Sequence, residues 1–199
     1  MNKLETTNQS EIEKVMKKVY YEFDTAVSYK IWVKNFALNL ENIWKEKSAK
    51  KLTENTVSDS VIVIGRGPSL KNHDHLNKLK SSNYNGAIIC TDGALITALK
   101  AGITPDRFPE FYVVTVDPRS ETIKFYNDKI INKYHGKIKG IFSTVSDPNT
   151  VKKARESGIE IFWFHSLVDY NEGEKSFNQI SALMTRAKNH ENGLPAIQT

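Results

Sequence analysis

A run of four β-branched residues followed by two glycines constrains this chain more than any other stretch. Val61–Ile64 are all apolar and β-branched, which is typical of a short strand buried on both faces of a parallel sheet. Gly65 and Gly67 then allow a sharp turn, and Pro68 has a φ angle suited to the first residue of a helix. A strand that leads through such a turn into a helix directs several backbone N–H groups at one point. The stretch therefore predicts an anion site at the end of a parallel strand.

Strand and helix patterns alternate through the rest of the chain. A helix is expected over residues 70–79, and short apolar runs predict further strands at residues 87–90, 111–116, 137–142 and 160–164. Alternating strands and helices with short connections indicate a parallel α/β sheet with right-handed crossovers. A weaker helical pattern follows at residues 180–187. We therefore expect an α/β domain over residues 57–199.

The N-terminal residues 1–56 have a different pattern and predict a helical segment. Apolar residues recur at helical spacing from Ser10, and a second apolar series runs from Ile31 to Trp44, so one long helix or two broken helices are expected. These helices should pack on the sheet or on a partner chain. An oligomerisation or substrate-lid role is the alternative, which leaves a homodimer open. The polar stretch from Ser48 to Ser60 is expected to be a linker.

Composition narrows the class of protein. The 199 residues include one cysteine, Cys90, in an apolar stretch, so we expect no internal disulfide and a small core residue at that position. Apolar runs are too short for a membrane span, and we expect a cytoplasmic location. A net charge of +5 permits an anionic partner. Lysines and acidic residues are interleaved, and no zinc-ligand spacing or RNA-binding motif is present, so no nucleic-acid partner is expected.

The ends of the predicted strands carry the residues of chemical interest. In an open parallel sheet, ligands bind beyond the carboxyl ends of the strands. In chain order these ends contain Gly65, Arg66, Gly67, Pro68 and Ser69, then Asp92 and Gly93, then Asp117, then Ser143, then His165. A glycine turn that holds phosphate oxygens, beside two carboxylates that hold a metal ion or its waters, forms a magnesium–polyphosphate site.

Each of these signals also has a structural interpretation. Asp92 could cap its helix, and Asp117 could start the turn that Pro118 fixes. Arg66 could reach a phosphate or remain a solvated loop cation. His165 is the one histidine considered for acid–base work, with a structural role as the commoner alternative. The glycine turn lacks the third glycine of a dinucleotide fingerprint, which disfavours NAD.

Four motifs in order resemble those of a known family. They are I-G-R-G-P-S-L at residues 64–70, T-D-G-A at 91–94, A-G-I-T-P-D at 101–106 and V-D-P at 116–118. This set resembles the archaeal 6-hydroxymethyl-dihydropterin pyrophosphokinase-like (MptE-like) family, whose domain also occurs in bacterial motility-associated factors implicated in flagellin glycosylation. The resemblance covers roughly residues 57–199 and implies a Rossmann-like fold, with the parallel sheet as the middle of three layers.

The archaeal members imply a reaction in which pyrophosphate passes from ATP to a pterin hydroxymethyl group, with Mg²⁺. By motif position, Gly65, Arg66, Gly67, Pro68 and Ser69 would bind phosphate, whereas Asp92 and Asp117 would be catalytic and would hold the metal. Substrate contacts are expected at Gly93, Asp106, Ser143 and His165.

The motility-associated branch implies an alternative, a nucleotide-sugar glycosyltransferase that acts on a glycan or a surface protein. A non-catalytic binding fragment is the third alternative. Family members continue beyond the region of Leu194, so we expect the domain to be truncated at its C-terminus and to lack part of its active site.

Overall fold

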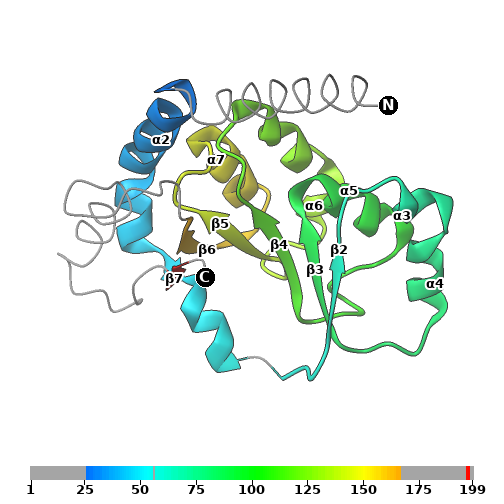
Figure 1. Cartoon of the computed structure of the whole chain (residues 1–199). Coiled ribbons are helices and arrows are strands. Elements are labelled where there is room, and N and C mark those ends of the chain that lie inside the picture. The colour runs from blue at the N-terminus through cyan, green and yellow to red at the C-terminus, as the bar shows by residue number, and fades with distance from the viewer. Residues whose placement is uncertain (1–25, 56, 167–195, 198–199) are drawn as a thin grey trace, which may run out of the picture.

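An all-parallel sheet of seven strands forms the centre of the fold. In the computed structural model, residues 26–55, 57–166 and 196–197 are described (Figure 1). Five strands follow one another across the sheet, namely β2 (Val61–Ile64), β3 (Ala87–Thr91), β4 (Phe111–Thr115), β5 (Lys139–Ser143) and β6 (Glu160–His165). The short strands β1 (Lys47–Ser48) and β7 (Ala196–Ile197) both pair with β6. The predicted parallel α/β fold is confirmed. The helices predicted from Ser10 and over residues 180–187 lie outside the described residues, the first except for its last turn.

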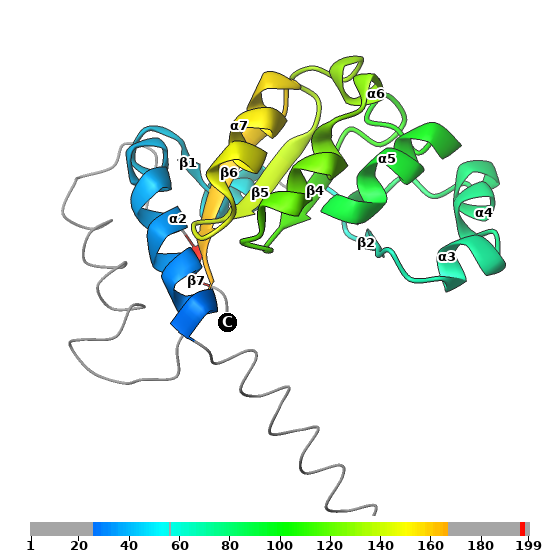
Figure 2. The same ribbon diagram turned by 90° about the horizontal axis from the view of Figure 1, so that it is seen from above.

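The strand order determines where the connecting helices lie. From β2 to β6, each new strand adds to the same side of the one before, and right-handed crossovers then place the connections on one face. Helices α3 (Ser69–Asn72) and α4 (His75–Ser81) connect β2 to β3, and the later connections contain α5 (Asp92–Ala101), the 3₁₀ segment η2 (Ser120–Tyr126), α6 (Lys129–Asn132) and α7 (Pro148–Glu156). Figure 2 shows α5, α6 and α7 together above the strands. These elements form one of the two outer layers expected of a three-layer fold.

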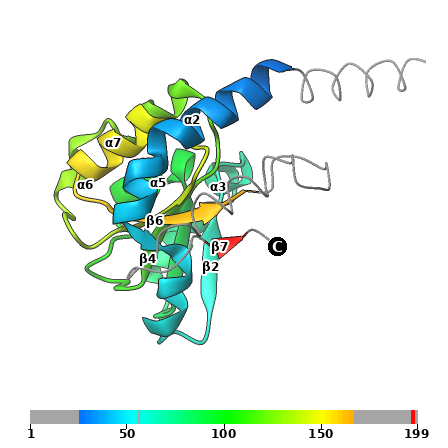
Figure 3. The same ribbon diagram turned by 90° about the vertical axis from the view of Figure 1, so that its left-hand side faces the viewer.

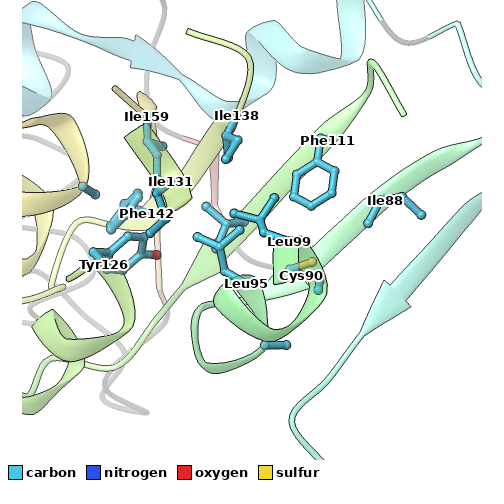
Figure 4. Close-up of a cluster of buried hydrophobic side chains, with 14 of the residues drawn as sticks. Ile88, Cys90, Leu95, Leu99, Phe111, Tyr126, Ile131, Ile138, Phe142 and Ile159 are labelled. Atoms are coloured by element: carbon cyan, nitrogen blue, oxygen red, sulfur yellow. The ribbon is translucent and has the colours of Figure 1, made fainter. Parts of the chain in front are cut away.

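The main core lies between the sheet and α5 (Figure 4). Leu95 and Leu99 of α5 are buried against a cluster that includes Ile88 and Cys90 of β3 and Phe111 of β4. Burial raises the pKa of the Cys90 thiol to about 12, so the thiol stays protonated at physiological pH. Cys90 is the small core residue that its apolar neighbours predict.

The first strand of the series is an edge strand, and this changes its burial. Val61 and Val63 are 51% and 66% exposed, whereas Ile64 is buried. The prediction that this strand is buried on both faces is wrong, because the side chains of Val61 and Val63 point to the same face of the sheet and that face is exposed at this strand. The helix predicted over residues 70–79 is also divided, into α3 (Ser69–Asn72) and α4 (His75–Ser81). Asp74 separates the two pieces with a left-handed φ of 53°, a conformation that aspartate tolerates better than most residues.

The N-terminal helix α2 (Ala26–Lys45) packs on the α/β domain (Figure 3). Asn35 donates from Nδ2 to the carbonyl oxygens of Pro118 at 2.8 Å and Val145 at 3.0 Å, which ties α2 to the loops after β4 and β5. Asn39 makes the equivalent pair of bonds to two further carbonyls of the β5 loop. Packing on the sheet domain is therefore confirmed for this helix.

The segment after α2 joins the sheet, although its polar sequence predicts a linker. It forms β1 and then the 3₁₀ segment η1 (Ala49–Asn55). Backbone pairing with β6 needs no apolar side chains, which explains why the pattern gave no strand signal. In the described ranges, no helix has the length and apolar character needed to cross a bilayer.

Candidate functional site

The glycine turn after β2 has an unusual property, which is that the chain itself does not need its glycines. Residues 65–69 are all exposed. Neither Gly65 nor Gly67 has a positive φ. A Cβ atom added at Gly65 would meet no atom within 4 Å, and one added at Gly67 would meet only Ser69 Oγ, at 3.7 Å. The sharp glycine-only turn predicted from the sequence is thus absent, and the missing side chains instead leave backbone that another molecule can approach closely.

The element that follows the turn contributes little helix dipole. Pro68 is predicted to be the first residue of the helix, but it is the N-cap, with φ −61°. Helix α3 therefore begins at Ser69, and it runs for only four residues. A helix of one turn has too few aligned peptide groups for the macrodipole expected from the sequence. Any attraction of this turn for an anion must therefore come from its exposed backbone N–H groups and from nearby cations.

Arg66 connects the glycine turn to the beginning of α5. Its guanidinium lies over the ring of Phe125 in η2, 5.1 Å from the ring centroid. A Cβ atom at Gly93 would lie 2.5 Å from Arg66 Cδ, so the glycine at that position makes room for the arginine side chain. The charge of Arg66 also opposes the increase that burial causes in the pKa of Asp92. Arg66, Asp92 and Gly93 are therefore brought together, and Arg66 packs on an aromatic ring although it is exposed.

The two aspartates lie within electrostatic reach of each other but differ in their surroundings. Burial raises the pKa of Asp92, and the negative charge of Asp117 adds to this increase. Opposing contributions come from Arg66 and from the Gly93 N–H, which donates to Asp92 Oδ1 at 2.6 Å. Hydrogen bonds from Arg119 lower the pKa of Asp117, whose two carboxylate oxygens accept from Arg119 Nε at 2.9 and 3.1 Å. Asp117 is thus held ionised, whereas Asp92 carries its charge in a less favourable place.

The structural interpretations of these aspartates are partly correct. Thr91 occupies the N-cap of α5, and Asp92 is the first helical residue, so Asp92 is not the cap. Asp117 does shape its turn, because the backbone N–H of Arg119 donates to Asp117 Oδ1 at 2.9 Å. Asp92 keeps acceptor capacity for a further ligand, since an ionised carboxylate offers about four lone-pair positions and Asp92 accepts one hydrogen bond, from Gly93. The oxygens of Asp117 accept four hydrogen bonds from Arg119, so a metal ion would have to replace some of them.

Ser143 and His165 lie in a closed polar layer beneath α2 and not in an open site. Ser143 is fully buried, and its hydroxyl shares a hydrogen bond of 2.6 Å with Ser166. His165 is 6% exposed and its Nδ1 lies 3.0 Å from Thr144 Oγ1. Burial lowers the pKa of His165 to about 4, so the imidazole is neutral at pH 7. The burial of His165 favours its structural interpretation, and the burial of Ser143 does not support the predicted substrate contact.

Asp106 is the one predicted site residue that the structure places at the amino ends of the strands, opposite to the carboxyl ends where Asp92 and Asp117 lie. Helix α5 returns the chain to the amino ends of the strands before Asp106 is reached. There the carboxylate pairs with Lys137, with a distance of 2.6 Å between Nζ and Oδ1. This position separates Asp106 from Asp92 and Asp117, so its placement does not support substrate binding with them.

Two residues of the site were missed by reasoning from the sequence. Arg119 lies two positions after Asp117, and a turn brings side chains at this spacing together. The sequence therefore contained enough information to predict this ion pair. Phe125 had no such signal, because its place in an apolar series indicated core packing, whereas it is half-buried and supports Arg66.

The carboxylates fit a metal ion that arrives with a phosphate ligand. Within the described ranges, no group of three or more His, Cys, Asp or Glu side chains is arranged to hold a metal. Mg²⁺ commonly binds through one or two carboxylates, and waters and substrate phosphates complete its six ligands. Asp92 and Asp117 supply two hard oxygen donors at the edge that carries the exposed glycine backbone.

Comparison with known proteins gives one result. The family model described as "6-hydroxymethylpterin diphosphokinase MptE-like" matches residues 34–189. The matched range begins within α2 and includes the glycine turn and both aspartates. No curated protein matches the chain significantly.

Proposed function

The chain belongs to the MptE-like family, described as 6-hydroxymethylpterin diphosphokinase MptE-like, and from this we propose that it is a Mg²⁺-dependent transferase that uses ATP. The reaction we favour is the transfer of diphosphate to a hydroxymethyl group of a pterin. The observation that carries the proposal is the glycine turn, whose two bare backbone positions serve no need of the chain itself and lie next to two interacting carboxylates.

The residues of the site have separate roles in this proposal. The backbone N–H groups around Gly65 and Gly67 and the hydroxyl of Ser69 bind phosphate oxygens. Arg66 neutralises part of the phosphate charge from its position over Phe125. Asp92 and Asp117 hold Mg²⁺, which would neutralise charge on the phosphates and orient them.

Catalysis in this proposal consists mainly of positioning. The oxygen of the acceptor hydroxyl forms a bond to the β-phosphorus of ATP and loses its proton to solvent. The bond from that phosphorus to the oxygen bridging to the α-phosphate breaks, and AMP leaves. Such a transfer gains most from holding the two reactants in line and from stabilising charge, which is what rigid strand ends can provide. His165 has no part in it, because it is buried and neutral.

A ligand panel tests the proposal. The melting temperature and the binding heat of the purified chain are measured with ATP, GTP, sugar nucleotides and 6-hydroxymethylpterin, each with and without MgCl₂. We expect ATP to stabilise the fold more strongly with Mg²⁺ than without it. A folded protein that no nucleotide stabilises would refute the proposal, and a preference for a sugar nucleotide over ATP would assign glycosyl transfer instead.

A further inference from the structure

A cavity of about 560 Å³ lies between the edge strand β2 and helices α3 and α4. Its walls are largely apolar and are formed by Ile62, Ile64, Leu70, Leu76, Leu79 and Tyr84. This volume is within the range of about 300–1,000 Å³ that is usual for small-molecule sites. Figure 1 shows α3 and α4 beyond the free side of β2.

The cavity is continuous with the glycine turn. Gly65, Gly67 and Ser69 line it as well, so the backbone proposed to bind phosphate forms part of its wall. Lys78, on the exposed side of α4, also lines it and adds a positive charge. A ligand with an apolar body and a phosphate group would therefore find surroundings suited to both parts in one space.

The edge of β2 adds a hydrogen-bonding pair to this space. The N–H of Ala87 in β3 donates to the Ser60 carbonyl at 3.0 Å, and in a parallel pair the bonding residues then alternate along the strand. Ile62 and Ile64 therefore bond to β3, whereas the N–H and C=O groups of Val61 and Val63 point outward. Val63 lines the cavity and Val61 does not. No strand in the described part of the chain pairs with that side of β2.

We propose that this cavity binds a flat heteroaromatic ring, either that of ATP or that of the pterin, which carries phosphate once it is the diphosphorylated product. The ring lies among the aliphatic side chains, and a neighbouring donor and acceptor on its edge pair with the N–H and C=O of Val63. Its phosphate extends to Gly65 and Gly67, so this inference rests on the proposed function for the phosphate. Purines and pterins share the required chemistry, because both are fused rings with a donor next to an acceptor.

A substitution to proline tests the ring site, with a matched control on the same strand. Val63→Pro removes the outward N–H and leaves the bonds to β3 intact, since proline is tolerated at outward-facing positions of an edge strand. Val61→Pro makes the same change outside the cavity. Binding of ATP, 6-hydroxymethylpterin and inorganic tripolyphosphate is measured by calorimetry, each with MgCl₂, and folding is checked by thermal melting.

We expect Val63→Pro to weaken one of the two ring-bearing ligands about tenfold, as loss of one hydrogen bond would do, and to leave tripolyphosphate binding unchanged. The ligand that is weakened identifies the ring. Val61→Pro should match the wild type throughout. Equal binding by Val63→Pro and wild type, equal loss in both variants, or no binding of either ring-bearing ligand to the wild type would overturn the inference. An equal loss of binding in Val61→Pro and Val63→Pro would indicate instead that a peptide strand pairs along the whole of β2.

The arms of this experiment separate the two proposals. Failure of tripolyphosphate to bind would refute the phosphate site, yet binding of 6-hydroxymethylpterin by wild type and not by Val63→Pro would still support the ring site.

If Val63→Pro does not fold, Leu70→Trp replaces it, because Leu70 is half-buried and lines the cavity. Its control is Lys71→Trp on the exposed side of the same helix. Leu70→Trp should exclude the ring, and unchanged affinity in that variant would overturn the inference.

Discussion

The guanidinium of Arg66 lies 5.1 Å from the centre of the Phe125 ring, and this pair joins loops that follow two different strands. Arg66 leaves the glycine turn after β2, and Phe125 belongs to η2, after β4. The arginine side chain crosses the start of α5, where Gly93 leaves room for it. The three loops at this edge of the sheet are therefore held in contact by one side chain, and Asp92 lies beside it.

The first prediction concerns the glycines of the turn. Gly65→Ala and Gly67→Ala should leave the free energy of unfolding unchanged or raise it by up to about 1 kcal/mol, because alanine restricts the unfolded chain and meets no clash in the folded one. The same variants should lose affinity for tripolyphosphate, since a methyl group covers the backbone. Urea denaturation and calorimetry measure the two effects.

A glycine with a different role provides the control. Gly158 has φ +88°, and a Cβ atom there would lie 2.3 Å from the His135 ring. Gly158→Ala should therefore destabilise the protein by about 1–3 kcal/mol. Alanine variants at residues 65 and 67 that unfold as easily as Gly158→Ala would show that the turn needs its glycines for folding.

The second prediction concerns the charge of Asp117. Asp117→Asn removes a carboxylate that faces Asp92 and weakens the contacts with Arg119. The Mg²⁺-dependent part of ATP binding should fall about tenfold or more, which titration calorimetry with and without MgCl₂ would measure. Asp106→Asn changes an acid at the other edge of the sheet and should have no such effect. Equal losses in the two variants would remove Asp117 from the metal site.

The third prediction concerns the pH dependence that arises from Asp92. Because its pKa is raised in the folded state, this carboxyl stabilises the fold most when it is protonated, and that contribution is lost as the pH rises through the raised pKa. Asp92→Asn should therefore raise the melting temperature at pH 7, and this advantage should shrink at acid pH. Nucleotide binding with Mg²⁺ should be lost in the same variant. A lower melting temperature at pH 7 would mean that the Asp92 charge stabilises the fold.

The fourth prediction concerns His165. Its folded pKa of about 4 lies below the usual 6.5, so the unfolded chain binds the extra proton more readily and stability falls as the pH drops from about 6.5 to about 4. The loss attributable to this residue is about 3 kcal/mol. His165→Gln should flatten the dependence of the unfolding free energy on pH in this range. An unchanged pH dependence in His165→Gln would contradict this assignment.

Several features of the fold and the site could be predicted from the sequence for physical reasons. The β-branched run Val61–Ile64 and its counterparts identified five strands, and the rule for carboxyl strand ends brought Asp92 and Asp117 to one edge. The same reasoning was wrong for the burial of Val63, because an apolar run does not show that one face of its strand lacks a covering layer.

Other features depend on contacts that are distant along the chain. Asp106 was grouped with the site by its motif, although α5 carries the chain to the other edge before that residue. Asn35 bonds to Pro118 across 83 positions, and no local pattern indicates such a pair. The polar turn at Asp74 could have suggested the break between α3 and α4, but the apolar spacing of Leu76 and Leu79 masked it.

The asparagines of α2 have a consequence for how the molecule can be divided. The side-chain amides of Asn35 and Asn39 together donate hydrogen bonds to four main-chain oxygens of the loops that follow β4 and β5. A fragment started at residue 57 would lose these four hydrogen bonds and would uncover the apolar surface on which Phe36 and Ile43 of α2 are buried. Recombinant versions meant to isolate the α/β domain should therefore retain α2, which is bonded to the loop that carries Asp117.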